Sequence, residues 1–209
     1  MHSPLVRFPA KTLLVPSRYC GSIDYYAAVA AYGSSCIDTE SRFNKRDKAA
    51  HRTTIADVNG PLLLTVPIAK PEHISDAKWT DIYVSSHGSW SDVHRVALES
   101  AYGRTPFFEF YADRILPLIQ FDNQKIIELN SALDKVIRDI LGLPEPVEHD
   151  ESSNIVKYQE ETLPVVEYYQ VRSGNLGFIP HLSVLDLIFN MGPESPLILK
   201  KMINFASLT

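Results

Sequence analysis

The chain carries its most concentrated positive charge in the segment 42–52. Its five cations are Arg42, Lys45, Arg46, Lys48 and Arg52. They stand against one acid, Asp47, in a protein whose formal net charge is −5. Clustered cations on an acidic protein attract anions, and an arginine can hold a phosphate or a carboxylate by two hydrogen bonds. The segment predicts an anion-binding site, and the alternative is a solvated loop whose cations balance nearby acids.

His94 is the candidate for proton transfer. It shares one face of a predicted helix with Trp90, Ala97, Leu98 and Ala101, since residues three, four and seven positions apart lie on the same side. At the edge of a pocket, modest burial would tune its pKa for a general acid or base. The alternative is a core histidine with one satisfied hydrogen bond.

Tyr19, Cys20 and Tyr25 lie between the first predicted strand and the first predicted helix. Ligands of open α/β sheets bind at the carboxyl ends of strands, and anions favour helix N-termini. The two tyrosines are therefore candidate ligand-binding residues. Cys20 is a candidate nucleophile if a neighbouring cation lowers its pKa, and its alternative is a small buried apolar side chain.

Other chemistries leave no pattern in the sequence. The seven histidines include no HxxxH or HxH pair, so no metal site is predicted. GxGxxG, GxxxxGK[ST] and GxSxG are all absent, and the residues indicate no particular cofactor. The two cysteines form neither a CxxC motif nor a disulfide framework.

The charge and the apolar runs bound the partners. Nucleic acid and acidic membrane surfaces require a basic footprint, which a net charge of −5 does not provide. No apolar run approaches the roughly 20 residues that cross a bilayer, so no membrane insertion is expected. The N-terminus lacks the continuous apolar region of a signal peptide, and we predict a cytoplasmic protein.

The elements that position these residues begin with a strand–helix–strand unit. Residues 11–15 and 34–38 are predicted strands, joined by a helix over residues 23–32 that Gly33 ends. Two further strands, 53–58 and 62–66, flank Asn59-Gly60, which predicts a hairpin whose two turn residues both have positive φ. Residues 81–85 are predicted as another strand.

Helices dominate the remainder. One is expected to end at Tyr102, one to begin with Pro106 at its first position after the cap Thr105, and one to carry an apolar stripe over residues 126–141. An acidic surface loop follows at about 143–154. Ser183 and Asp186 fit a capping box, and a last helix is predicted from Ser195.

A length of 209 residues with 45% hydrophobic residues suffices for a substantial core. We expect one α/β domain over residues 1–209. It would contain a mixed sheet with the N-terminal strand–helix–strand unit and the hairpin, followed by a helical C-terminal half.

Several motifs resemble, in their order, those of the WbqC-like protein family. They are Tyr19-Cys-Gly-Ser-Ile-Asp-Tyr25-Tyr26; Glu40, Phe43, Lys45 and His51-Arg52; Asn59-Gly60 with Leu64-Thr-Val-Pro-Ile68; Trp90, His94, Ala101-Tyr102-Gly103 and Thr105-Pro-Phe-Phe108; and Tyr169-Gln-Val171, Gly177-Phe178 and Leu182-Ser-Val-Leu-Asp-Leu187. The resemblance spans about residues 11–200. The sequence departs from the family at Gly21-Ser22, where prolines are frequent, and at His51, where asparagine is usual.

The resemblance implies a protein of bacterial surface-polysaccharide precursor synthesis that acts on a nucleotide-linked or amino sugar. A transferase of acyl or aminoacyl groups is the implied enzyme, and a non-catalytic interaction module of a glycan-biosynthesis complex is the alternative. The module would show Phe107, Phe108 and Tyr111 as an exposed patch. For the enzyme, an anionic small molecule would be held by the predicted binding residues, with His94 as acid or base. These binding residues are Tyr19, Tyr25, Lys45, Arg46, His51, Arg52, Trp90 and Tyr102.

Overall fold

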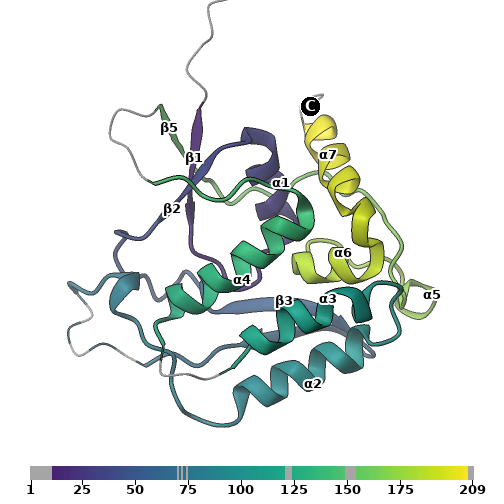
Figure 1. Ribbon diagram of the computed structural model, residues 1–209, viewed down its shortest axis with the longest axis horizontal. Coiled ribbons are helices and arrows are strands. Elements are labelled where there is room, and N and C mark those ends of the chain that lie inside the picture. The colour runs from purple at the N-terminus through teal and green to yellow at the C-terminus, as the bar shows by residue number, and fades with distance from the viewer. Residues whose placement is uncertain are drawn as a thin grey trace, which may run out of the picture.

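The computed structural model describes residues 11–69, 71, 73, 75–120, 124–148 and 154–206 (Figure 1). Strand β1 (Thr12–Pro16) lies at the centre of a three-stranded parallel sheet, between β2 (Ser35–Asp38) and β5 (Ile155–Lys157). Helix α1 (Ile23–Tyr32) is the crossover from β1 to β2. The predicted strand–helix–strand unit is therefore confirmed, and β5 is a strand that the sequence did not predict.

Both ends of α1 follow from local chemistry. The Oγ of Ser22 accepts a hydrogen bond from the backbone N–H of Tyr25 and so satisfies a free donor of the first turn. Gly33 ends the helix with φ of 66°, a left-handed conformation that a side chain disfavours. The residues between them bury an almost continuous face, including Tyr25 and Tyr26.

The second sheet is the hairpin of β3 (Arg52–Asp57) and β4 (Gly60–Thr65). The hairpin is confirmed, but its turn differs from the predicted one. Asp57 pairs with Gly60, so Val58 and Asn59 form the turn, and Gly60, with φ of 114°, carries the positive φ that follows it. Asn59 keeps a negative φ, because a turn of this kind demands the left-handed conformation only at the glycine.

The expectation of a regular strand at residues 81–85 is wrong. A 3-10 turn, η1 (Trp79–Asp81), occupies its beginning, and the remainder forms only the isolated bridges Ile68–Val84 and Tyr83–Lys125. The alternating apolar residues Ile82 and Val84 are nevertheless buried, as in a strand with one face on the core. Each neighbouring segment forms a single bridge with this stretch, flanked by backbone hydrogen bonds, and no longer ladder develops.

The other regular elements of the described chain are helices. They are α2 (Trp90–Tyr102), α3 (Phe108–Ile115), η2 (Leu116–Leu118), α4 (Ile126–Leu141), α5 (Ser173–Leu176), α6 (Val184–Met191), η3 (Gly192–Glu194) and α7 (Ser195–Ala206). The α/β class and the helical C-terminal half are confirmed. Of the expected loop at 143–154, residues 143–148 have no regular structure and 149–153 lie outside the described residues.

Two predicted helix starts need correction. Helix α3 begins at Phe108, two residues after Pro106, because the Thr105 hydroxyl donates to the Tyr102 carbonyl instead of capping the new helix. At α6 the Oγ of Ser183 caps the N–H of Leu185. Asp186 does not complete the capping box, since its carboxylate accepts hydrogen bonds from Tyr168 and Gln170.

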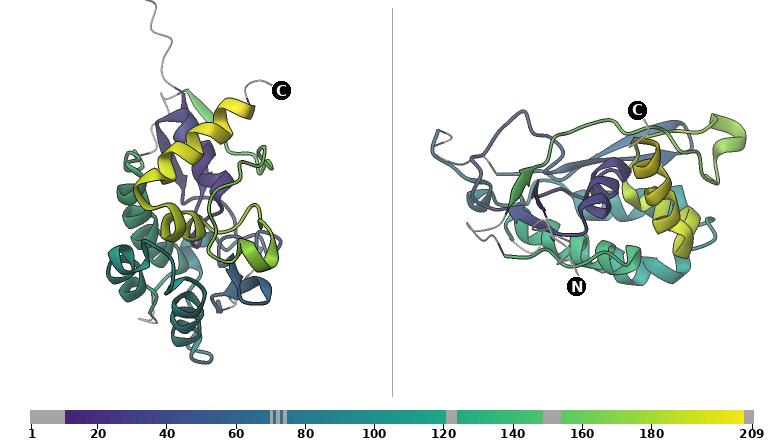
Figure 2. Two further views of the ribbon diagram at one scale, coloured as in Figure 1. Left: turned by 90° about the vertical axis from the view of Figure 1, so that its right-hand side faces the viewer. Right: turned by 90° about the horizontal axis from the view of Figure 1, so that it is seen from above.

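One hydrophobic core joins elements from the whole described length. It takes side chains from β1 and α1, from the hairpin, and from α2, α3, α4, α6 and α7. Helix α7 packs against α1, and Figure 2 shows the hairpin and the green-teal α4 on opposite sides of the molecule with α1 between them. This packing fixes the ends of β1 and β2, beside which the basic segment folds.

Candidate functional site

The basic segment folds as an anchored loop beside the carboxyl ends of β1 and β2. The N–H of Phe43 donates to the Ala77 carbonyl at 2.8 Å, and the Nδ2 of Asn130 donates to the Ala50 carbonyl at 2.8 Å. Ala49 accepts a further bond from the N–H of Tyr19 at 3.2 Å. These bonds tie the loop to η1, to α4 and to the end of β1, so its side chains start from fixed backbone positions.

The one acid of this loop is neutralised. Asp47 receives both hydrogen bonds from a single nitrogen of Arg18, with N–O distances of 2.6 and 2.7 Å. Arg18 is only 9% exposed, so the ion pair lies against the core and is screened less by water than a surface pair. Lys45 and Lys48 consequently have no acid within their own loop to balance them.

The first cavity at the loop, which we call the lysine hollow, has a volume of about 180 Å³. It is lined by Phe43, Asn44, Lys45, Lys48, His51, Ile68 and Trp79. Two of these side chains are cations and none is an acid. Phe43 and Trp79 meet edge to face, with ring centroids 4.8 Å apart, and form an apolar wall beside the charges.

A second cavity, the strand-end hollow, has a volume of about 250 Å³. Its lining is Leu14, Pro16, Asp38, Ser41, Arg42, Asn44, Asp47, Trp79, Lys157 and Tyr158. Pro16, Asp38 and Lys157 are the last residues of the three parallel strands. This is the edge at which open α/β sheets bind their ligands.

The two hollows meet at shared residues. Asn44 and Trp79 line both. Ligand sites for small molecules span about 300–1,000 Å³, so each hollow alone lies below that range and the two together reach it.

A third cavity has the opposite charge character. It measures about 440 Å³ and lies between the hairpin and α2, with Asp57, Leu62, Asp92, Val93, Val96, Ala97 and Ser100 around it. Two acids and no cation line this space, so its larger volume does not make it the better anion site.

His51 joins the lysines in the lysine hollow. Its side chain is 7% exposed, and its Nδ1 lies 3.0 Å from the backbone carbonyl of Val66. Burial lowers the pKa of this imidazole, the hydrogen bond to the Val66 carbonyl opposes the shift, and the charges of Arg52 and Lys48 lower the pKa further. The net lowering favours the neutral ring at pH 7. Of the predicted binding residues, the structure brings Lys45 and His51 together in this cavity.

His94 lies in the core rather than in either hollow. It is 2% exposed, and its Nδ1 is 2.9 Å from the hydroxyl of Tyr19. The ring of Trp90 packs edge to face on the imidazole, with centroids 5.3 Å apart. Burial lowers the pKa of His94 to about 4, although a hydrogen bond to the backbone of Thr65 opposes the shift. Tyr19, Trp90 and His94 thus form a buried cluster with no lining position in the two hollows.

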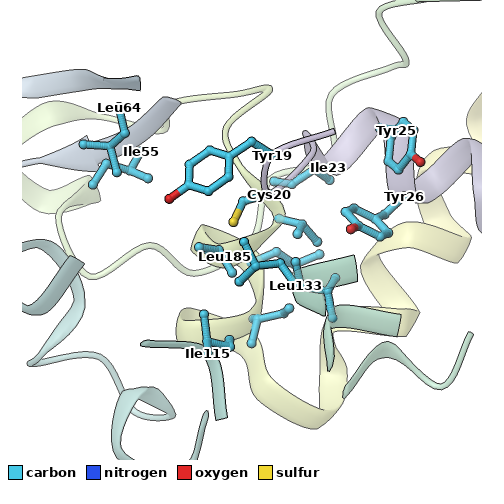
Figure 3. Close-up of a cluster of buried hydrophobic side chains, with 14 of the residues drawn as sticks. Tyr19, Cys20, Ile23, Tyr25, Tyr26, Ile55, Leu64, Ile115, Leu133 and Leu185 are labelled. Carbon is cyan, nitrogen blue, oxygen red and sulfur yellow. The ribbon is translucent and has the colours of Figure 1, made fainter. Parts of the chain in front are cut away.

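Cys20 is also sealed. Figure 3 shows its sulfur in the buried cluster that includes Tyr19, Ile23 and Leu185, and the residue is 1% exposed. Burial raises the pKa of the thiol, so it is protonated at neutral pH. Its backbone has φ of 44°, and its carbonyl accepts hydrogen bonds from the hydroxyls of Thr53 and Ser183 at 2.8 and 3.0 Å. The residue holds a turn between β1 and α1.

The two remaining predicted tyrosines lie apart. Tyr25 donates to the carbonyl of Pro16 and packs edge to face on Tyr158, so it supports the strand-end hollow from behind without lining it. Tyr102 accepts a hydrogen bond from the N–H of Ala56 and stacks on Phe189 in the core.

The two predicted arginines have different places. Arg46 is exposed, and its N–H donates to the side chain of Asn44, but it lines neither hollow. Arg52 opens β3 opposite Thr65 and is half-buried. Its Nε is buried without a hydrogen-bond partner among the described residues.

Residue reasoning missed three members of the site. Trp79 stands between the hollows, and Lys157 with Tyr158 comes from β5. Trp79 is one of only two tryptophans in the sequence, which is a signal that could have drawn attention to it. Lys157 carried no such signal, because its position depends on the pairing of β5 with β1.

A family model decides the relationship of this chain to known proteins. The model of the WbqC-like protein family matches residues 17–163. The chain belongs to the WbqC-like protein family. The matched residues include the basic loop, the hairpin, α2 and α4, whereas the resembling motifs at 169–187 lie beyond them. A search of curated proteins and a search of solved structures each found no match.

Two absences concern the described residues alone. Within them, no three side chains of His, Cys, Asp or Glu gather in a metal-binding arrangement. In the same part of the chain, none of the helices combines the length and the apolar character needed to cross a bilayer.

Proposed function

We propose that this WbqC-like protein binds an anionic sugar derivative across the lysine hollow and the strand-end hollow, with a nucleotide-linked sugar as the first candidate. The observation that carries the proposal is the lining of the lysine hollow. Lys45 and Lys48 stand there beside Asn44 and His51, without any acid. Such a surface favours phosphate, because ammonium groups form charge-assisted hydrogen bonds to its oxygens.

The second hollow supports a ligand of two parts. Arg42 and Lys157 stand there with the carboxylates of Asp38 and Asp47 and the hydroxyl of Tyr158, so its lining is mixed in charge. A sugar or a nucleoside carries donors and acceptors that match such a lining, and the wall of Phe43 and Trp79 offers an apolar surface between the halves. The phosphates would then lie at the lysines.

The resemblance stated above extends this proposal to surface-polysaccharide precursor synthesis, with acyl or aminoacyl transfer to the sugar as the reaction. We assign that chemistry to neither His94 nor Cys20. Both are almost fully buried, and the pKa shifts leave the imidazole neutral and the thiol protonated at pH 7. Their place in this proposal is to hold the core beneath the site.

The alternative of a non-catalytic interaction module finds less support. That alternative predicts that Phe107, Phe108 and Tyr111 form one exposed patch. Phe108 is 9% exposed and packs on Phe189, while Phe107 and Tyr111 are half-buried. Among these neighbours only Phe110 stands well into solvent, at 72% exposure.

Isothermal titration with UDP-glucose tests the proposal. Lys45→Ala and Lys48→Ala each remove one charge from the lysine hollow, and each is expected to raise the Kd about tenfold, which corresponds to ~1.4 kcal/mol. Lys201→Ala is the matched control, because Lys201 is an exposed lysine on α7 and lines neither hollow. Equal affinities for the wild type and both hollow variants would contradict the proposal, as would an equal loss in Lys201→Ala.

A further inference from the structure

The imidazole of His51 is fixed on one side. Its Nδ1 lies 3.0 Å from the carbonyl oxygen of Val66, and a carbonyl can only accept, so Nδ1 carries the hydrogen. The N–H of Val66 donates in return to the carbonyl of His51 at 2.9 Å. Val66 is fully buried, and this reciprocal pair continues the hairpin beyond Arg52 and Thr65. The ring therefore cannot turn without breaking a buried hydrogen bond.

The other ring nitrogen is left for a ligand. In the described part of the chain, the His51 side chain has the Val66 carbonyl as its hydrogen-bond partner. Its Nε2 is not among the buried side-chain atoms that lack a partner. His51 lines the lysine hollow together with Lys45 and Lys48. A neutral ring with its hydrogen on Nδ1 presents a lone pair at Nε2.

Burial lowers the pKa of His51 most, the hydrogen bond to Val66 opposes this shift, and the surrounding cations lower the pKa further. Lys48 and Arg52 act directly on His51, and Lys45 stands in the same hollow. Asp47 acts in the opposite sense, but its carboxylate is bound by Arg18. A positive charge on the ring would be repelled by three cations, so the role of His51 differs from that of the lysines.

We propose that His51 accepts a hydrogen bond from a neutral hydroxyl or amide N–H of the ligand, while Lys45 and Lys48 hold its anionic group. The inference rests on the proposed function, and it adds a specificity-determining residue and a ligand class. The site would prefer a phosphate ester that carries such a donor close to the phosphate, as a sugar phosphate does, over the bare anion. His51 would thus select the ligand rather than strengthen the positive charge.

Two probes separate these roles, inorganic phosphate and glucose 1-phosphate, titrated at pH 8 where the ring is neutral. His51→Asn can keep a donor to Val66 through its amide but places no acceptor at the position of Nε2. We expect it to weaken glucose 1-phosphate binding about fivefold, as the loss of one hydrogen bond predicts, and to leave phosphate binding within about twofold. Lys45→Ala should weaken both probes by similar factors.

His51→Phe provides a second variant that fills the same space without any ring nitrogen. It should show the same selective loss if its melting temperature shows that it folds. A ratio of the two affinities that stays at the wild-type value in both His51 variants would overturn the acceptor role and leave the proposed function standing. If the wild type binds neither probe nor UDP-glucose, the proposed function itself fails.

Discussion

At the scale of single residues, His94 shows how burial changes a role that its type suggests. Its imidazole is 2% exposed, with Tyr19 on Nδ1 and the ring of Trp90 against its face. Desolvation disfavours the charged form and lowers its pKa to about 4. In the unfolded chain the pKa of the same group is near the ordinary histidine value of 6.5. Between pH 4 and 6.5, His94 therefore binds a proton in the unfolded chain but not in the folded protein.

This difference predicts a loss of stability in acid. Above pH 6.5 both states are neutral at His94, and the group adds no pH dependence. As the pH falls from 6.5 towards 4, the unfolded state gains a proton that the folded state does not, so the free energy of unfolding falls. At pH 5 the linkage from this one residue is about 2 kcal/mol.

Urea unfolding of the wild type and His94→Gln at pH 7.5 and pH 5 measures the contribution of His94 to the pH dependence of the free energy of unfolding. The wild type should lose about 2 kcal/mol more than the variant between the two pH values. His87→Gln is the control, since His87 is exposed on a loop, and it should follow the wild type. Parallel losses in the wild type and His94→Gln would show that His94 is protonated alike in both states.

At the scale of elements, two helices end at glycines for the same reason. Gly33 after α1 and Gly142 after α4 have φ of 66° and 64°. No atom lies within 4 Å of where a Cβ would stand at either position. The glycines are therefore favoured by the backbone conformation alone and not by a close neighbour.

Gly33→Ala should accordingly cost about 1 kcal/mol, the strain of a left-handed alanine. Gly174→Ala is its matched control, because Gly174 also has open space around its Cβ position but lies in α5 without a positive φ. Urea denaturation should place that variant within about 0.5 kcal/mol of the wild type. A similar cost at both sites would mean that something other than the left-handed backbone is responsible.

Elements with local sequence signals were predicted correctly, and elements that depend on tertiary pairing were not. Helix α4 was predicted over its full length, because a 3.6-residue apolar stripe and a terminal glycine are both local signals. Strand β5 could not be predicted, since three residues carry no period and gain their structure from pairing with β1. The hairpin was predicted, but its turn type depended on which residues pair, which is set by the register of both strands.

The parts of the site likewise differ in whether the local sequence or the tertiary structure determines them. The basic loop is contiguous in the sequence, so its charge was visible without a structure. Trp79 and Lys157 reach the site through tertiary packing, and no local pattern pairs them with Lys45. The burial of His94 is likewise a property of the folded core, because the helical face that it shares with Trp90 could equally have bordered a pocket.

At the scale of the whole molecule, the site is a positive region on an acidic protein. The net charge is −5, so the molecule as a whole repels the anion that we propose Lys45 and Lys48 bind. The attraction must act over short distances, and exposed lysines are screened by salt with a Debye length of about 10 Å at 0.1 M. The balance between the two fields makes the affinity sensitive to ionic strength.

Titrations of UDP-glucose at increasing sodium chloride should therefore show a rising Kd. Between about 0.05 and 0.5 M salt, we expect a weakening of roughly threefold to tenfold for the wild type. The double variant Lys45→Ala/Lys48→Ala should show a flatter dependence, whereas Lys201→Ala should keep the wild-type slope. Parallel slopes in all three proteins would place the attraction outside the lysine hollow.

The position of Trp79 between the two hollows has an optical consequence. The only other indole, Trp90, is as little exposed as Trp79, at 6%, but it packs against His94 and lines neither hollow, so its emission should stay constant when a ligand binds there. A molecule that enters either hollow would contact the small exposed part of Trp79 and should alter the fluorescence of that ring. In a Trp90→Phe background the protein would hold a single intrinsic chromophore of this kind, and occupancy could be followed by light without any label.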